Sequence, residues 1–234
     1  MARIIVTMPA YNAEQTIAAT VERLPHVYDE ILLCDDASKD KTAAVARSLG
    51  LTVFEHGRNG GYGANQKTLY YEALQRNPDV IIMVHPDNQY DASNVGTGIR
   101  MIERGEADFI IGNRMSTARK DGMPFWRYVS NRFLTICQNL VFHSHMHELH
   151  SGLRLYKVSM LRQMPFEKFS DDFVFDSETI AWAFAHGFKF GEIPARCFYG
   201  FSESSINFKR SVAYGLATLK VLMRYMSGYY RRMR

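Results

Sequence analysis

The sequence predicts an α/β protein: a mostly parallel central sheet flanked by helices. The first observation is a strict alternation of short apolar runs and amphipathic helical patterns through the first 113 residues. The second is that these runs, such as residues 80–84, are continuously apolar, which is typical of strands buried on both faces. Strands alternating with helices favour parallel pairing through right-handed crossovers, and hence a doubly wound layer.

Five strands and four helices account for the first half of the chain. The strands are expected at residues 3–8, 30–35, 51–55, 80–84 and 109–112. The helices are expected at residues 13–24, 40–49, 64–77 and 93–103. Asn12 and Ser93 stand where a side chain can cap a helix, and Gly50 and Gly105 stand where a helix stops.

After residue 113 the alternation loosens. A polar loop is expected at 113–123, strands at 149–156 and 188–193, and helices at 124–143, 176–186 and 211–230. No linker composition interrupts the chain. We therefore expect one domain over residues 1–208, made of the halves 1–113 and 114–208, followed by a C-terminal helical segment, 209–234.

The composition is that of a folded globular protein. Of 234 residues, 47% are hydrophobic and 22% charged. Cys34, Cys137 and Cys197 are odd in number and widely spaced, so a disulfide framework is disfavoured and a reducing, cytoplasmic setting is expected. The first apolar run is too short for a signal peptide, and no run is long enough to span a bilayer.

Polar segments follow the predicted strands at residues 9–14, 35–42, 85–89 and 112–114. Because parallel strands place their carboxyl ends at one edge of the sheet, where ligands bind, we expect these segments to meet. Acids and an arginine there suit a ligand with a sugar or base and phosphates, together with a divalent cation. Asp, Asn and Pro are also ordinary turn residues, so a plain surface turn is the alternative for 85–91.

Two other functional classes fit poorly. Nucleic-acid binding is disfavoured because the same edge is lined with acids. A dinucleotide-dependent dehydrogenase is disfavoured because no Gly-x-Gly-x-x-Gly follows the first strand.

Five motifs in order, PAYN-x-E, DDASKDKT, HPDNQ, GNR and HSGLR, resemble those of family 2 glycosyltransferases of the GT-A (Rossmann-like) fold. The resemblance runs from residue 4 to about residue 208 and is closest to the branch of dolichyl-phosphate mannose synthase and polyprenyl-phosphate sugar synthases. It implies a nucleoside-diphosphate-sugar donor (UDP or GDP), bound by residues 1–113, and a divalent cation, Mg or Mn. It also implies inverting transfer to an acceptor bound by residues 114–208. A polyprenyl phosphate, a soluble sugar or glycan, and a catalytically impaired nucleotide-sugar-binding subunit all stay open.

The resemblance also implies roles for the strand-end residues. Those matching the nucleotide-binding positions are Pro9, Tyr11, Asn12, Glu14, Asp36, Asn59 and Gly61. The family's metal loop is typically Asp-x-Asp-x-Gln, and this chain has His85 in place of the first acid, so Asp87 and Gln89 are the expected metal ligands. We expect His85 beside the diphosphate; weakened metal dependence is the alternative, because imidazole suits Mn²⁺ better than Mg²⁺.

Three arginines match positions near the phosphates in the lipid-phosphate branch: Arg114, Arg127 (offset by about one position) and Arg154, the last in the motif that contains Ser151. Arginine forks fit phosphate oxygens, whereas surface ion pairing is the alternative. The expected catalytic set is Asp87, Arg114, Arg154 and Glu178. A phosphate acceptor is already ionised and needs no base; for a hydroxyl acceptor, Asp176 and Glu178 are the candidates.

The C-terminal segment 209–234 has no acidic residue. Its apolar positions are Val212, Leu216, Leu219, Met223 and Met226, and helical geometry places them in one arc, with Lys209, Lys220, Arg224 and Arg231 adjacent. Such a helix suits an anionic membrane surface, although packing of the apolar arc on the core is equally compatible. We therefore expect a cytoplasmic protein, either free or peripheral on the membrane face, and a homo-oligomer stays open.

Histidines cluster before the last motif. His143 and His147 have the helical spacing of a transition-metal pair, but a position near a helix end explains them equally well, so zinc is disfavoured. His150 directly precedes Ser151 and is expected to face the donor site.

Overall fold

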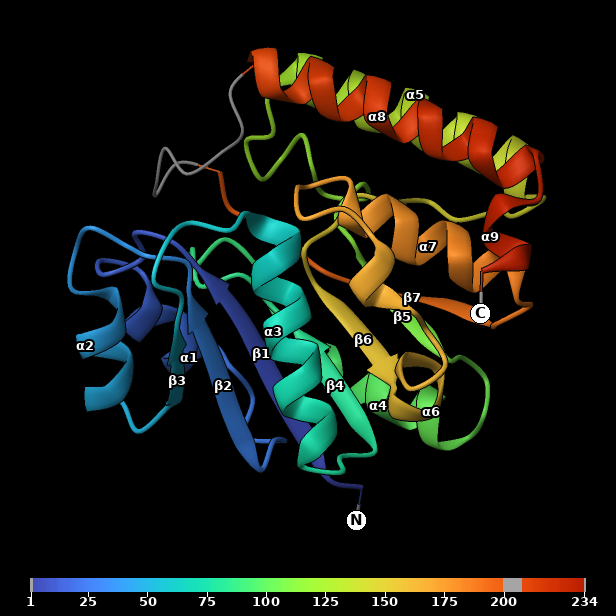
Figure 1. Ribbon diagram of the computed structural model, residues 1–234. Helices are drawn as coiled ribbons and strands as arrows, with labels where there is room; N and C mark the ends of the chain where they lie inside the picture. The colour runs from blue at the N-terminus through green and yellow to red at the C-terminus, as the bar shows by residue number, and fades with distance from the viewer. Residues whose placement is uncertain (1, 200–207, 234) are drawn as a thin grey trace.

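A computed structural model describes residues 2–199 and 208–233 (Figure 1). Within them one seven-stranded sheet has the order β3-β2-β1-β4-β6-β5-β7. The strands are β1 (Ile4–Ala10), β2 (Glu30–Asp35), β3 (Thr52–Glu55), β4 (Val80–Met83), β5 (Phe109–Asn113), β6 (Arg154–Lys157) and β7 (Phe190–Pro194). β6 runs antiparallel to both neighbours, and the other pairings are parallel. The carboxyl ends of β1, β2, β4 and β5 therefore share one edge, as predicted.

Helices cover both faces of the sheet. They are α1 (Ile17–Arg23), α2 (Thr42–Ser48), α3 (Tyr62–Gln75), α4 (Val95–Glu103), α5 (Phe125–Phe142), α6 (Val158–Leu161), α7 (Phe175–Ala185), α8 (Phe208–Met226) and α9 (Tyr229–Arg232), with a 3-10 turn at Phe166–Lys168. Alternate strand residues feed two cores: Ile5 and Ile81 belong to the core with α3 and α7, and Val6 and Ile82 to the core with α1, α2 and α4. This confirms the predicted α/β fold class.

Strands from both predicted halves interleave in this sheet, since β6 lies between β4 and β5. The division of residues 1–208 at residue 113 stays a prediction.

Three local predictions are wrong. Asn12 does not cap a helix: its φ is 51°, its side chain accepts a hydrogen bond from Lys39 N at 2.9 Å, and α1 begins only at Ile17. Ser93 does not cap α4, which begins at Val95 without a side-chain cap. The strand expected at 149–156 is shorter and lies at Arg154–Lys157, and residues 149–153 are not part of it.

The predicted C-terminal helix is two helices. α8 ends at Met226, and Gly228, with φ 74°, introduces α9. Of the predicted apolar arc, Leu219 is half-buried, whereas Leu216 is 64% exposed and Met226 65% exposed. Within the arc, Leu219 packs against the core and the other four residues are exposed; the buried residues of α8 include Thr218, Val221 and Leu222. The side chain of Lys209 lies outside the described residues. None of the helices in the described ranges is long and apolar enough to cross a membrane.

Candidate active site

The loops after β1 and β2 are joined by hydrogen bonds at the carboxyl edge of the sheet. Asn12 Oδ1 accepts from Lys39 N at 2.9 Å, and Glu14 Oε2 accepts from Lys41 N at 3.0 Å. Pro9 is buried within β1, whereas the Tyr11 ring is 49% exposed. Of the nucleotide-binding positions predicted in this loop, Tyr11 thus presents an open ring, and Asn12 and Glu14 hold the two loops together.

The glycine-rich turn before α3 is organised by Asp36. The two carboxylate oxygens of Asp36 accept from Gly60 N at 2.8 Å and from Gly61 N at 2.9 Å, and Asn59 Nδ2 donates to its carbonyl at 3.2 Å. Gly61 has φ 98°, and a Cβ there would lie 2.5 Å from the carbonyl oxygen of Asp171, so a glycine is required. The structure thus brings Asp36, Asn59 and Gly61 together, and their binding of a nucleotide stays a prediction. A hollow of about 600 Å³ lies beside this turn, lined in part by His56 and Arg58.

The loop after β4 carries the predicted metal ligands. Thr16 Oγ1 donates to the carbonyl of Pro86 at 2.6 Å, and Asn88 takes the left-handed conformation, with φ 56°. Within the loop, Gln89 N donates to Asp87 Oδ1 at 3.1 Å. The Asp87 carboxylate and the Gln89 amide oxygen are oxygen ligands of the kind that would hold Mg²⁺ or Mn²⁺, and Gln89 Oε1 lies 3.9 Å from Cys197 Sγ. Among the described residues no three Asp, Glu, His or Cys side chains lie close enough together to hold a metal ion.

His85 heads a buried hydrogen-bonded chain. Its Nε2 lies 2.9 Å from the hydroxyl of Tyr62, and that hydroxyl donates to Asp176 Oδ2 at 3.1 Å. Gln66 Nε2 donates to the other oxygen of Asp176 at 2.9 Å. Burial lowers the pKa of His85, so its imidazole is neutral near pH 7.

Gly152 lies against the same histidine. A Cβ at this position would lie 2.9 Å from His85 Nε2 and 3.1 Å from the Tyr90 hydroxyl. The absence of a side chain at Gly152 is therefore what lets the motif that contains Ser151 and Arg154 approach the loop after β4.

Arg114 is buried in an ion pair. Its Nε donates to Glu148 Oε1 at 2.8 Å and its backbone N donates to Glu148 Oε2 at 2.7 Å, and Glu148 is fully buried. Its Nη1 reaches the hydroxyls of Tyr90 and Tyr199 at 3.3 and 3.2 Å. Its Nη2 donates to the carbonyl of His150 at 3.0 Å. Arg114 thus ties β5 to the segment that precedes β6.

Arg154 is also buried, at 1% exposure. Its Nε donates to the carbonyl of Ser151 at 2.9 Å, and its Nη1 lies 2.9 Å from Asp176 Oδ1 but makes no hydrogen bond. His150 Nε2 is likewise buried without a hydrogen-bond partner. Burial and the nearby charges of Arg114 and Arg154 lower the pKa of His150 to about 3. His150 Nε2 has no hydrogen-bond partner, and Arg154 Nη1 has only the Asp176 carboxylate beside it. Nitrogens with unused hydrogen-bonding capacity near the positive charges of Arg114 and Arg154 are suited to bind an anion.

Three further residues that were predicted to bind the acceptor or act in catalysis make the following contacts. Arg127 lies on α5 with its guanidinium over the rings of Trp126 (5.3 Å) and Tyr199 (5.9 Å). Ser151 Oγ accepts from Leu153 N at 3.3 Å. Glu178 accepts from Ser170 N at 2.7 Å, Arg224 Nη1 at 3.3 Å and the Tyr230 hydroxyl at 3.2 Å.

The contacts of Glu178 bind it to the C-terminal helices. Because residues two apart on a helix point about 200° apart, Asp176 faces the strand-end cluster and Glu178 faces away from it. A catalytic role for Glu178 stays an untested prediction, and the geometry favours Asp176.

Sequence reasoning missed Glu148, Tyr62, Tyr90 and Tyr199. None of them lies in a motif. The one available signal was the rule that a buried arginine needs a buried acid, and Glu148 is the acid closest in sequence to the motif of Arg154.

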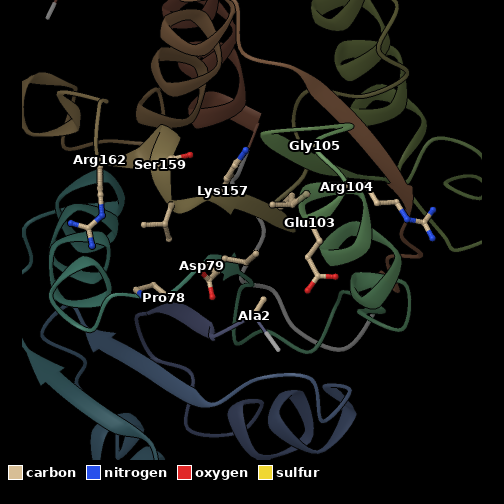
Figure 2. Close-up of a pocket in the computed structure, with 12 residues that line it drawn as sticks. Ala2, Pro78, Asp79, Glu103, Arg104, Gly105, Lys157, Ser159 and Arg162 are labelled. Carbon is tan, nitrogen blue, oxygen red and sulfur yellow. The ribbon is translucent and has the colours of Figure 1, made fainter.

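A separate hollow of about 740 Å³ lies at the opposite end of the sheet (Figure 2). The charged residues that line it lie just before β4, at the end of α4, at the end of the antiparallel β6 and just after α6: Asp79, Glu103, Lys157 and Arg162. It therefore takes no part in the strand-end cluster.

Comparisons with known proteins agree with this geometry. Residues 5–164 match the family described as Glycosyl transferase family 2. An uncharacterised protein of Methanocaldococcus jannaschii is 30% identical over 223 residues, covering 94% of this chain and 91% of its own. The UDP-N-acetylglucosamine–dolichyl-phosphate N-acetylglucosaminyltransferase of Methanococcus voltae is 24% identical over 215 residues, covering 84% of this chain and 86% of its own.

Among solved structures, glucosyl-3-phosphoglycerate synthase from Mycobacterium tuberculosis, in complex with Mn²⁺, UDP and glucosyl-3-phosphoglycerate, superposes with a TM-score of 0.73. The two chains share 14% identity over 97% of this chain and 80% of the other, which establishes a common fold. The chain is therefore a glycosyltransferase of the GT-A fold and belongs to glycosyl transferase family 2.

Proposed function

We propose that this enzyme transfers a sugar from a nucleoside diphosphate to the phosphate of a polyprenyl phosphate, with inversion at the anomeric carbon. The observation that carries the proposal is the pair of buried nitrogens without hydrogen-bond partners, Arg154 Nη1 and His150 Nε2, beside Arg114. A phosphate monoester brings the anionic oxygens that such donors need. The Methanococcus voltae relative, whose name gives dolichyl phosphate as acceptor, supports the same acceptor class.

The donor nucleotide belongs at the ends of β1, β2 and β4. Tyr11 offers an exposed ring for the base, and the turn held by Asp36 borders the neighbouring hollow. Asp87 and Gln89 would hold a divalent cation, which when bound neutralises charge on the diphosphate. The UDP in the name of the relative and in the solved neighbour favours UDP over GDP as the nucleotide.

The transfer is a single displacement. An acceptor phosphate oxygen attacks the anomeric carbon while the bond from that carbon to the β-phosphate oxygen breaks, and the electron pair leaves with the nucleoside diphosphate. Because the acceptor is already ionised, no proton has to be removed, and positioning supplies most of the catalysis. Asp176 is the positioning residue, since it contacts Arg154, Tyr62 and Gln66.

Arg154→Lys tests the acceptor site, because it keeps the charge but loses the planar fork. We expect transfer to polyprenyl phosphate to fall by roughly 100-fold or more, by analogy with the loss of one oxyanion donor, with UDP binding unchanged. Transfer that proceeds equally to an unphosphorylated polyprenol or to a soluble sugar would overturn the assignment of the acceptor.

A catalytically impaired nucleotide-sugar-binding subunit is a second candidate, and His85 is the observation that favours it. Comparison of the wild type with His85→Asp, which restores the acid typical of the family, separates the two. Transfer activity in the wild type supports an active enzyme. An inactive wild type, together with an active His85→Asp variant, supports the impaired subunit.

We further propose that the protein works at the cytoplasmic membrane face as a peripheral protein, because the acceptor is a lipid. The acid-free segment 209–234 supplies the expected contact.

A further inference from the structure

α5 and α8 lie side by side and together form one end of the molecule (Figure 1). The rings of Phe142 on α5 and Tyr225 on α8 pack edge to face with centroids 4.8 Å apart. A Cβ at Gly215 on α8 would lie 3.9 Å from Leu134 on α5. Since Leu134 pairs with Gly215 and Phe142 with Tyr225, the two helices run in the same direction.

α5 carries an apolar stripe that the fold leaves uncovered. The stripe recurs with helical spacing and is 46–71% exposed at its four central positions, Val129 (46%), Phe133 (57%), Ile136 (50%) and Leu140 (71%). Leu134, Gln138 and Phe142, on the opposite side of the helix, are buried. The helix is therefore anchored through its inner side, and its outer side is hydrophobic without a covering partner in the described chain.

α8 carries a second such stripe. Val212, Leu216, Met223 and Met226 are 47%, 64%, 59% and 65% exposed. Neighbouring uncovered apolar stripes on two packed helices make a patch of the kind that marks an interaction surface.

The charges around the two apolar stripes indicate which kind of partner covers them. Neither α5 nor the segment from Phe208 to the end of the chain contains an acidic residue. Arg119 and Lys120, just before α5, are exposed, as are Lys220 on α8 and both Arg231 and Arg232 on α9. An apolar face bordered by cations matches an anionic lipid surface, whereas a second copy of this face would oppose cations to cations.

The position of the face relative to the site agrees with a lipid partner. Tyr214, on the inner side of α8, places its hydroxyl 2.9 Å from His150 Nδ1 and 3.3 Å from Ser177 Oγ. One side of α8 therefore touches the proposed phosphate site while the other side is exposed and apolar. A bilayer against the exposed side would therefore lie one helix diameter, roughly 10 Å, from His150.

We propose that the outer faces of α5 and α8 form one docking surface for an anionic lipid bilayer, with α5 supplying half of it. The inference deepens the proposed function, on which it rests for the link between membrane docking and the acceptor. It adds α5, whose stripe lies far in sequence from the basic C-terminal segment.

The test is flotation with vesicles of phosphatidylcholine, with or without phosphatidylglycerol. Phe133→Asp combined with Leu216→Asp places one charge on each helix without removing core packing. We expect the wild type to float with the anionic vesicles, less so at high salt, and the double variant to lose at least about tenfold in partitioning. Lys220→Glu should lose about fivefold or more, the equivalent of about 1 kcal/mol per basic residue at an anionic surface.

Tyr71→Asp is the matched control. Tyr71 is 59% exposed on α3, away from this face, so its substitution should leave flotation unchanged. Analytical ultracentrifugation of the same proteins tests the rival occupant: a wild-type dimer that the double variant dissociates, without flotation, would overturn the proposal. Equal flotation of the wild type and the double variant would overturn it as well.

A water-soluble short-chain isoprenyl phosphate separates this proposal from the proposed function. We expect the double variant to keep wild-type transfer to the soluble acceptor and to lose transfer to bilayer-embedded acceptor. Flotation without transfer to either acceptor would contradict the proposed function alone, and transfer without flotation would contradict the docking surface alone.

Discussion

The ion pair between Arg114 and Glu148 is the contact whose loss should be most costly to the fold. Glu148 is fully buried, Arg114 is 7% exposed, and Glu148 accepts from both the guanidinium and the backbone of Arg114. Glu148→Gln keeps the volume and one acceptor but leaves a buried guanidinium without its counter-charge. Breaking a buried pair on one side costs about 3–5 kcal/mol, against a total stability of about 5–15 kcal/mol.

The assay is urea and thermal unfolding. For a chain of this size that loss corresponds to a fall in Tm of roughly 6–20 °C. Glu55→Gln is the matched control, because Glu55 pairs with Arg47 on the surface, with both side chains about half exposed, and should cost no more than about 1 kcal/mol. Arg114→Met combined with Glu148→Leu should recover part of the loss, because no charge is then left buried. A Glu148→Gln protein within about 1 kcal/mol of the wild type would refute this reasoning.

Three further predictions concern the strand-end cluster. Because the pKa of His150 is lowered from 6.5 to about 3 in the fold, the unfolded chain takes up the proton first as the pH falls, and His150 removes stability below about pH 6.5. His150→Gln should therefore lose stability less steeply between pH 6.5 and 5, by up to about 1.4 kcal/mol per pH unit, and parallel stability curves would contradict the assignment. Gly152→Ala should displace His85 and lower transfer by more than about tenfold, whereas Gly96→Ala on α4, where the nearest atom to a Cβ is Arg100 Nη1 at 3.6 Å, should be neutral; equal rates in the two variants would count against the close approach. Mn²⁺ with UDP at about 100 times its Kd should stabilise the wild type by about 2.7 kcal/mol, and Asp87→Asn or chelation should remove the Mn²⁺-dependent part; an Asp87→Asn protein with the full effect would exclude Asp87 as the ligand.

The layers of the fold could be predicted because they depend on local pattern. Continuous apolar runs identify strands buried on both faces, and parallel direction fixes the shared edge. The antiparallel direction of β6 could not be predicted, since the four residues Arg-Leu-Tyr-Lys at Arg154–Lys157 carry no pattern that sets the direction of the strand. The cap predicted at Asn12 failed because its side-chain oxygen accepts a long-range hydrogen bond from Lys39 N. The cap predicted at Ser93 failed because α4 begins only at Val95.

Candidate site residues could be named from the sequence where they belong to short contiguous motifs. Asp36 and Asp87 lie in loops that follow β2 and β4 at the predicted edge of the sheet, and the binding roles assigned to them stay predictions. Glu148 and Tyr62 were missed because their role is to satisfy a buried charge or hydroxyl brought from a distant segment. No spacing in the sequence encodes that pairing. The exposure of the apolar arc on α8 could not be predicted either, because it depends on which face of the helix packs against the rest of the protein. Tertiary contacts determine that face.

The measurement that tests the central claim most directly is the transfer of radiolabelled sugar from UDP-linked donors, with Mn²⁺, to a polyprenyl phosphate and to the matching unphosphorylated polyprenol. We predict transfer to the phosphate only, a single product with inverted anomeric configuration, and loss of that transfer in Arg154→Lys. Transfer to the unphosphorylated alcohol, or undiminished transfer by Arg154→Lys, would contradict the assignment of the buried arginine site to an acceptor phosphate.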